Sequence, residues 1–293
     1  MPQSRFVVLE DRGVLAIAGP DRVSFLQGLV SNDTTRVSDQ RAVYAALLTP
    51  QGKYLHDFIM VESGEAILLD AEAARLGDLK RRLSIYRLRA KVTIEERTDL
   101  AVAAVFDGAA FGLSSEAGAA HALGRGVAFI DPRLASLGAR AILPREEIRP
   151  VLTSTGAVET DFAEYDRLRL SLGIPDGSRD LVLDKSILLE SGFDELNGID
   201  WDKGCYIGQE LTARTKYRGL IKKRLFPVQI DGPAPEPGAI ISIDGHEAGE
   251  MRSSRDGLGL ALLRLETMSA ADKLQSGPSS IAPMKPDWMR LPE

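Results

Sequence analysis

Cysteine is almost absent from this chain of 293 residues, in which Cys205 is the single thiol. One thiol cannot form an internal disulfide, and it cannot supply the several thiolates of a metal site within one chain. The sequence therefore excludes a disulfide-stabilised scaffold and predicts no resident metal site. A reducing compartment suits such a chain, and we expect a cytoplasmic protein.

Long apolar runs and a strong excess of one charge are missing too. The longest uncharged apolar run, residues 43–49, is far shorter than the roughly 20 residues that cross a bilayer, so we expect no membrane span. Residues 1–11 carry three charges and do not resemble a secretory signal. The net charge of −6, from 36 Lys and Arg against 42 Asp and Glu, argues against a DNA-coating protein.

The composition that remains is that of ordinary globular domains, and the first third of the chain alternates between strand and helix patterns. Leu76, Leu79 and Leu83 recur at helical spacing, and another helix is predicted over residues 21–30. Residues 49–52, Thr-Pro-Gln-Gly, predict a hairpin turn. This order resembles the split βαβ arrangement, an antiparallel sheet covered by helices on one side. Strands are expected at residues 14–18, 42–48, 54–62, 66–70 and 92–96.

The last quarter of the chain has a different pattern. Asp-Gly pairs at residues 231–232, 244–245 and 256–257 separate short apolar runs, and Asp-Gly is a strong signal for tight hairpins. This predicts a small all-β domain, either a sandwich or a barrel. Beyond Thr267 the chain has four prolines and little pattern, so we expect a tail that is extended over the surface or frayed.

The middle of the chain gives a mixed signal. Residues 109–126 are rich in Gly, Ala and Ser, which predicts a loop or a weak helix. A helix is expected to end at Gly173, with Pro175 just beyond it. Further strands are expected at residues 100–106, 127–131 and 139–143. Taken together, the patterns predict an α+β protein with domains at residues 1–97, 98–217 and 218–293.

One stretch concentrates reactive and polar side chains. Residues 203–210 read Lys-Gly-Cys-Tyr-Ile-Gly-Gln-Glu, where glycines allow close approach of a partner and the other residues offer charges, an amide and a thiol. Residues 214–224 follow with six cations and no acid. Such a basic patch attracts an anionic ligand or RNA phosphate and raises the thiolate fraction of Cys205. The alternatives are a small buried cysteine and a solvated strand edge.

Residues 203–210 match the Lys-Gly-Cys-Tyr-x-Gly-Gln-Glu signature of the YgfZ-type folate-binding proteins, which are relatives of the glycine-cleavage T protein. The similarity runs from about Val14 to Leu265, and it includes residues 25–33, 48–52 and 196–199. The resemblance implies two interlocked ferredoxin-like α+β domains and a C-terminal β-barrel around a central folate cavity. It also implies binding of tetrahydrofolate or a one-carbon-substituted folate.

The same resemblance implies support of iron–sulfur cluster assembly or repair, and hence maturation of cluster enzymes such as tRNA-modifying enzymes. The signature cysteine, here Cys205, is regarded as the functional thiol of the family. In the aminomethyltransferase relatives an Asp after the first hairpin turn lies beside the reactive nitrogens of folate, and Asp57 occupies that place. A carboxylate there holds or deprotonates an amine. The other residues expected to contact folate are Asn32, Arg169, Lys203, Tyr206, Gln209, Glu210 and Arg214.

Several alternatives stay open. Asp57 also fits a helix cap or a surface charge, and Arg169 also fits an ion pair across a domain boundary. His56 is a weaker candidate, because neighbouring strand residues face opposite sides. A cluster-carrying role would require Cys205 to share ligands with a partner or a small thiol.

The function itself has alternatives as well. One is a folate-dependent aminomethyltransferase or other one-carbon transferase with Asp57 as the central carboxylate, so the sequence leaves open whether the protein is an enzyme. Another is an RNA-binding module, which is weaker because Tyr217 is the one aromatic residue of the basic run. We expect a monomer that binds folate and iron–sulfur client or assembly proteins, with a weak tRNA contact through Arg214 to Arg224.

Overall fold

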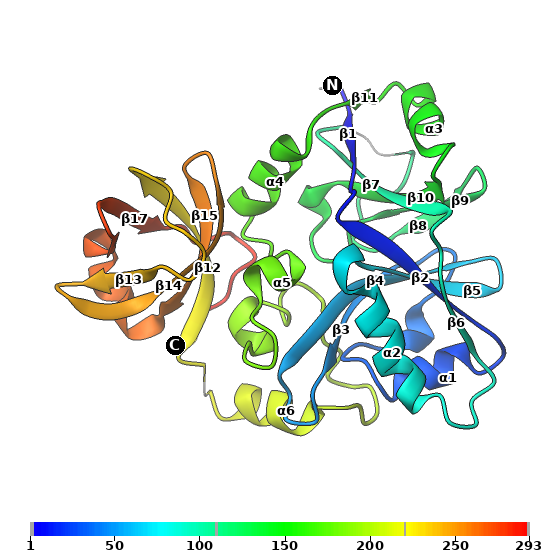
Figure 1. Ribbon diagram of the computed structural model, residues 1–293, viewed down its shortest axis with the longest axis horizontal. Coiled ribbons are helices and arrows are strands. Elements are labelled where there is room, and N and C mark those ends of the chain that lie inside the picture. The colour runs from blue at the N-terminus through cyan, green and yellow to red at the C-terminus, as the bar shows by residue number, and fades with distance from the viewer. Residues whose placement is uncertain (1–2, 109–110, 220, 292–293) are drawn as a thin grey trace. The chain divides into compact units, whose positions relative to one another are not determined.

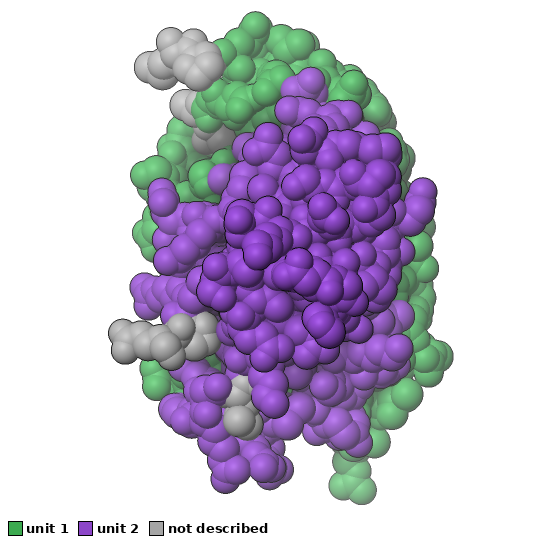
Figure 2. All heavy atoms as spheres, turned by 90° about the vertical axis from the view of Figure 1, so that its left-hand side faces the viewer, with its two compact units in different colours: residues 1–48, 55–162, 196–207 green, residues 49–54, 163–195, 208–293 purple. Residues whose placement is uncertain are grey.

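A computed structural model of the chain describes residues 3–108, 111–219 and 221–291. The chain forms two compact units, which are coloured separately in Figure 2. Unit 1 comprises residues 1–48, 55–162 and 196–207, and unit 2 comprises residues 49–54, 163–195 and 208–293. The division into three domains stays a prediction. No helix among the described residues is long and apolar enough to cross a membrane.

The first sheet of unit 1 has five strands in the order β3-β4-β5-β2-β6 (Figure 1). The strands and the second helix form where the sequence predicted them, and the hairpin turn at residues 49–52 is confirmed. The first helix is shorter than predicted and ends at Gln27. The elements are β2 (Arg12–Ala18), α1 (Arg22–Gln27), η1 (Thr34–Arg36), β3 (Val43–Leu48), β4 (Tyr54–Ser63), β5 (Ala66–Glu72), η2 (Ala73–Arg75), α2 (Leu76–Tyr86) and β6 (Thr93–Glu96).

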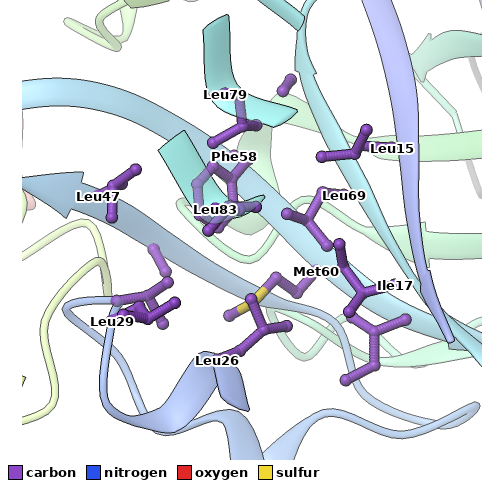
Figure 3. Close-up of a cluster of buried hydrophobic side chains, with 14 of the residues drawn as sticks. Leu15, Ile17, Leu26, Leu29, Leu47, Phe58, Met60, Leu69, Leu79 and Leu83 are labelled. Atoms are coloured by element: carbon purple, nitrogen blue, oxygen red, sulfur yellow. The ribbon is translucent and has the colours of Figure 1, made fainter. Parts of the chain in front are cut away.

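Helices α1 and α2 cover one face of this sheet. Leu79 and Leu83 of α2 point into a core that also contains Phe58 and Met60 of β4 (Figure 3). Burial of apolar surface contributes about 25 cal/mol per Å², so this layer fixes the sheet against the two helices. Because strand residues alternate between faces, the side chains between these core positions lie on the opposite face of the sheet. That opposite face carries the polar residues of the candidate site.

The second sheet of unit 1 has six strands in the order β11-β1-β7-β10-β9-β8. Helix α3 packs on one face through Ile148 and Leu152, which lie in a core with residues of β1, β7 and β10. One prediction is wrong here, because Ala120–Leu123 of the expected loop forms a strand at the sheet edge; residues 109–110 of that segment lie outside the described residues. The elements are β1 (Arg5–Val8), β7 (Leu100–Phe106), β8 (Ala120–Leu123), β9 (Gly126–Ile130), η3 (Ala135–Leu137), β10 (Ala139–Pro144), α3 (Ile148–Ser154) and β11 (Val158–Glu159).

Unit 2 contains a closed barrel with strands in the order β12-β15-β14-β13-β16-β17 (Figure 1). The predicted barrel is therefore confirmed, and the helix predicted before Gly173 is α4. The elements are α4 (Phe162–Ser171), α5 (Gly177–Asp180), η4 (Leu188–Ser191), α6 (Gln209–Tyr217), β12 (Lys223–Asp231), β13 (Ile240–Ile243), β14 (His246–Arg255), β15 (Leu258–Arg264), η5 (Leu265–Lys273), β16 (Gln275–Ser276) and β17 (Ser279–Pro283).

Two of the three Asp-Gly pairs make the predicted tight turns, and the tail differs from its prediction. Residues 244–245 and 256–257 have positive φ at both positions, as a type I′ turn requires. Residues 231–232 lie at the end of β12, well before β13 begins, so they form no tight hairpin.

The prediction of a loose tail is wrong: β16 and β17 close the barrel, and Ile281 and Met289 are buried in its core. The strands of the tail, β16 and β17, are too short to show a clear alternation of apolar and polar residues in the sequence.

His56 links β4 to α2 in unit 1. Its Nε2 lies 2.9 Å from Oδ2 of Asp78, and the Arg75 guanidinium is close by. Burial, and then the charge of Arg75, lower the pKa of His56 to about 4, although Asp78 opposes this shift. The imidazole is therefore neutral in the folded protein at neutral pH. As the strand alternation predicted, His56 faces α2 and not the side of Asp57.

This shift predicts a pH-dependent loss of stability. Because the unfolded chain binds a proton on His56 near pH 6.5 and the folded protein does so only near pH 4, the free energy of unfolding falls as the pH is lowered through this window. Between pH 7 and pH 5, His56→Gln should remove about 2 kcal/mol of that fall. Urea denaturation at several pH values measures it. His246→Gln, at an exposed histidine, should keep the wild-type slope, and an unchanged slope in His56→Gln would contradict the assignment.

Candidate functional site

Asp57 is buried on the face of β4 that is turned away from α1 and α2, with 5% of its surface exposed. Its Oδ2 accepts a hydrogen bond of 2.9 Å from the hydroxyl of Tyr44 on β3. Burial and the Asp57 carboxylate raise the pKa of Tyr44 well above its usual 10.0, so the phenol keeps its proton and remains a donor. The alternatives for Asp57, a helix cap or a surface charge, are wrong because the residue is buried within a strand.

A continuous chain of buried ion pairs joins the two sheets of unit 1. Asp70 of β5 pairs with Arg12 of β2, at 2.7 Å between Oδ1 and Nε, and with Arg140 of β10. Arg140 also reaches Asp131, at 3.2 Å between Nε and Oδ2, and Arg133 binds the same Oδ2 at 2.8 Å. All five side chains are buried. We call this chain of five residues the buried ion network.

The network keeps its carboxyls charged, and one of its arginines lies against the ring of Tyr44. Burial alone would raise the pKa of Asp131 and Asp70, but the paired arginines outweigh it and lower the pKa of Asp131 to about 2 and that of Asp70 below its usual value. The guanidinium of Arg133 lies 5.6 Å from the centre of the Tyr44 ring. The network itself contains three arginines and two carboxyls, so it carries an excess of one positive charge.

A pocket of about 270 Å³ opens beside β3 in unit 1. Tyr44, Asn32 and Asn197 line it, and the cations of Arg36 and Arg41 stand around it. Arg41 pairs with Glu116 at 2.8 Å, and Arg36 lies 3.4 Å from a carboxylate oxygen of Asp200. The pocket therefore combines backbone and amide groups with two arginines whose partners are exposed or loosely held, which suits a polar ligand that carries negative charge.

Asn32 holds the pocket wall together. Its Nδ2 donates to the carbonyl of Tyr44 and to the carbonyl of Asn197, both at 2.7 Å, and its Oδ1 accepts from the Asp33 amide at 2.8 Å. Asn197 itself has a φ of +56°, a conformation that asparagine tolerates better than most residues. The amide of Asn32 thus crosslinks β3 to the segment before the signature. A contact between Asn32 and a ligand stays a prediction.

Lys203 anchors the signature loop to the end of α1. Its Nζ donates to the carbonyls of Gln27, Val30 and Asn32 at 2.9, 2.6 and 2.7 Å. Burial lowers the pKa of Lys203 to about 8, against the opposing charges of Asp33 and Asp200. The three carbonyls occupy the three donors of the ammonium group, so its position in the structure is that of a loop anchor.

The anchored loop leaves its thiol accessible. Cys205 is exposed, so the alternative of a small buried cysteine is wrong. Tyr206 beside it is buried, with the Lys203 ammonium 5.2 Å from its ring centre. The combination of a fixed lysine and a buried aromatic ring holds the backbone on either side of the exposed sulfur. Cys205 is therefore not a packing residue of the core, and a chemical role for its sulfur stays a prediction.

The remaining predicted site residues lie in unit 2. Gln209, Glu210 and Arg214 belong to α6, where Glu210 and Arg214 are exposed and Gln209 is half-buried. Gly208 precedes helix α6 as its N-cap residue, and its carbonyl oxygen lies only 2.9 Å from where a Cβ at Gly52 would stand. Gly52 also has a φ of +70°, so glycine is required there for two reasons. Ligand contacts by these α6 residues stay predictions.

Arg169 is the centre of a second buried ion cluster, within unit 2. It pairs with Asp166 at 2.7 Å and with Asp180, and its Nη2 donates to Oγ of Ser253 in the barrel at 2.7 Å. Coulombic attraction to Asp180 and other carboxylates raises the pKa of Arg169 in spite of its burial. Arg169 is therefore engaged in ion pairs, but with acids of its own unit and not across a domain boundary as the alternative had it; a folate contact stays a prediction.

Part of the positive charge of residues 214–224 is paired with acids in the structure. Arg224 is buried and pairs with Glu195 at 2.8 Å, and Lys216 pairs with Asp194 at 3.1 Å. Both acids lie outside the eleven-residue window that the sequence analysis considered. Two of the six cations are thus committed within unit 2.

Comparison with known proteins identifies relatives over nearly the whole chain. Residues 222–291 match the family model described as the CAF17 C-terminal beta-barrel domain. The chain is 35% identical to the mouse mitochondrial iron-sulfur cluster assembly factor IBA57, over 96% of the chain and 84% of that protein. The human protein of the same name is 36% identical, with the same coverage of both chains.

Among solved structures, the fold resembles the glycine cleavage system aminomethyltransferase T from Bartonella henselae, with a TM-score of 0.78 and 13% identity. The similarity covers 96% of this chain and 85% of that one. It confirms the predicted aminomethyltransferase-like α+β fold with its C-terminal barrel.

The comparisons contradict one prediction. The relatives are named as mitochondrial factors, so the expectation of a cytoplasmic protein is wrong. That expectation relied on a single cysteine, which indicates a reducing compartment but does not say which one.

Removal of Arg140 tests the buried ion network. Arg140→Leu leaves Asp70 and Asp131 with one arginine each in a buried layer, so we expect the free energy of unfolding to fall by about 3 to 5 kcal/mol. Urea denaturation followed by circular dichroism measures the loss. Arg125→Leu, which removes a cation from exposed ion pairs with Glu146 and Glu147, should change it by less than about 1 kcal/mol. Equal effects of the two variants would show that the network does not stabilise unit 1.

Proposed function

Because the chain belongs to the IBA57 family of iron-sulfur cluster assembly factors, we propose that it serves in iron–sulfur cluster assembly and that it binds a tetrahydrofolate. The observation that carries the first part is the similarity along almost the full length of the relatives, together with an accessible thiol on an anchored loop. Mitochondrial relatives support the same compartment for this chain. The YgfZ-type signature at residues 203–210 supports folate as the ligand.

The groups in unit 1 fit a reduced folate in their chemistry. Asp57 with its phenolic partner Tyr44 offers a buried carboxylate to the N–H groups of a reduced pterin. The arginines at the pocket, Arg36 and Arg41, suit the carboxylates of the glutamate end. At about 270 Å³ the pocket of unit 1 takes one portion of a folate, since pockets for whole ligands of drug size measure about 300 to 1,000 Å³. Bound folate would supply the nitrogens that carry a one-carbon unit.

Cys205 is the residue that we assign to cluster chemistry. A thiolate can ligate iron or attack a disulfide, from which the second sulfur leaves as a thiolate, and exposure makes the sulfur of Cys205 available to a second protein. Four-iron clusters are generally coordinated by several thiolates, so this chain would share the cluster with a partner or a small thiol. Maturation of cluster enzymes, including tRNA-modifying enzymes, would then depend on Cys205, and no direct tRNA contact is needed.

A complementation experiment tests the assembly role. In cells that lack the endogenous gene, the wild-type chain should restore the activity of a four-iron cluster enzyme, and Cys205→Ser should restore less than about one tenth of it, because a hydroxyl does not replace a thiolate ligand. Asp202→Asn, an exposed change in the same loop, should restore activity as the wild type does. Full restoration by Cys205→Ser would exclude the thiol from the function.

A titration with tetrahydrofolate under reducing conditions tests the ligand. Wild type should bind saturably, Asp57→Asn should bind at least about tenfold more weakly because a charge-assisted hydrogen bond is lost, and Cys205→Ala should bind as the wild type does. Calorimetry measures all three. The absence of binding by wild type would remove folate from the proposal and leave the assembly role to the complementation experiment.

The Asp57–Tyr44 pair also favours a second candidate function, a folate-dependent aminomethyl or one-carbon transferase. A buried carboxylate held by a protonated phenol is suited to holding or deprotonating an amine. The two functions differ in which residue they need. Turnover of an aminomethyl donor that is lost in Asp57→Asn but kept in Cys205→Ala would establish the transferase.

A further inference from the structure

The C-terminal end of α2 and the turn after it expose apolar side chains. Ile85 is 61% exposed, Tyr86 41% and Leu88 87%. Leu79 and Leu83 of the same helix point into the core under the sheet (Figure 3), and Ile85 follows them on the solvent side. Soluble proteins expose single apolar residues often, but three large ones within four positions form a patch that commonly marks an interaction site.

Leu88 occupies a strained backbone position. It follows the C-cap residue Arg87 with a φ of +40°, the left-handed conformation that glycine usually adopts just past a helix end. A side chain with a Cβ is disfavoured there, and a leucine more so than an asparagine. Contacts within the protein do not compensate for the strain, since Leu88 is the most exposed large apolar side chain among the described residues. A strained residue that gains no packing within its own protein indicates a contact with another molecule.

Basic residues flank this patch along the sequence. Residues 80–91 contain six Lys and Arg and no acid, within a chain whose net charge is −6. Three of the six pair with carboxylates of unit 1: Arg81 and Arg82 with Asp78, and Lys80 with Glu96. In the described part of the chain, no carboxylate pairs with the other three, the exposed Arg87, Arg89 and Lys91.

We propose that residues 85–91, the α2 docking surface, bind an acidic protein partner that receives Leu88 and Ile85 in an apolar depression rimmed by carboxylates. Tyr and Arg are the residues that most often dominate protein interfaces, and an apolar centre with a charged rim is the usual layout. A second copy bound through the same surface would set cations against cations. A nucleic acid would not use the apolar centre, because phosphate contacts carry its affinity.

The test uses the full chain with a photo-crosslinking amino acid in place of Ser84, an exposed residue one turn before Leu88. Crosslinking is done in native cells, and the captured protein is identified, purified and titrated against unmodified variants. Leu88→Gly should weaken binding by about tenfold or more, while its denaturation midpoint is kept or raised because glycine relieves the positive φ. The double variant Arg87→Glu and Arg89→Glu should weaken binding similarly, with a smaller salt dependence.

Ile240→Thr is the control, because it changes another exposed apolar side chain, 54% exposed, in the barrel and away from the α2 docking surface. It should bind as the wild type does. The proposal is overturned if the captured protein binds Leu88→Gly and wild type equally, or if crosslinks at Ser84 do not exceed those from an exposed barrel position. Crosslinks to lipid alone, with Leu88-dependent binding to phosphatidylcholine vesicles that contain phosphatidylglycerol, would also overturn it in favour of a membrane surface.

Discussion

The buried ion network of unit 1 is the constraint on which the candidate site depends. Charges removed from water are tolerated only when their partners are placed well, because the desolvation cost of each ion is several kcal/mol. Arg140 forms ion pairs with two carboxylates, that of Asp70 in the first sheet and that of Asp131 next to the second sheet. The two sheets therefore cannot shift past each other without leaving a charge unpaired. This fixes the layer in which Asp57 and Tyr44 meet.

A second set of contacts connects this layer to the signature loop. Lys203 binds the carbonyl of Asn32, the amide of Asn32 binds the carbonyl of Tyr44, and the hydroxyl of Tyr44 binds Asp57. The lysine of the signature is thus connected to the buried carboxylate through backbone and amide groups. The same anchor keeps Cys205 at the surface. In the proposed function the buried carboxylate and the exposed thiol would serve different chemistry, and one hydrogen-bonded path connects the segments that carry them.

The sequence predicted those elements whose signal is local. Helix α2 follows from three leucines at helical spacing, the 49–52 turn from its Pro and Gly, and two hairpins from Asp-Gly pairs that adopt positive φ. The closing strands of the barrel were missed, because two to five residues show too little alternation. The partners of Asp57 were missed for another reason. The tyrosine that binds Asp57 comes from a neighbouring strand, and Arg140, which binds Asp70, comes from the second sheet, so tertiary structure alone brings them together, as it does Arg224 and Glu195.

The exceptions to ordinary sequence rules in unit 1 are of two kinds, and the difference between them is the basis of the proposed α2 docking surface. Buried charges such as Asp70 break the rule that charged residues stay at the surface, but their arginine partners within the unit compensate fully. The positive φ of Asn197 is likewise supported by its own hydrogen bonds. Leu88 is different, because it combines a strained backbone with exposure and gains no packing. An unusual residue whose partners lie within the protein contributes to stability. An unusual residue without such compensation, such as Leu88, indicates a contact with another molecule.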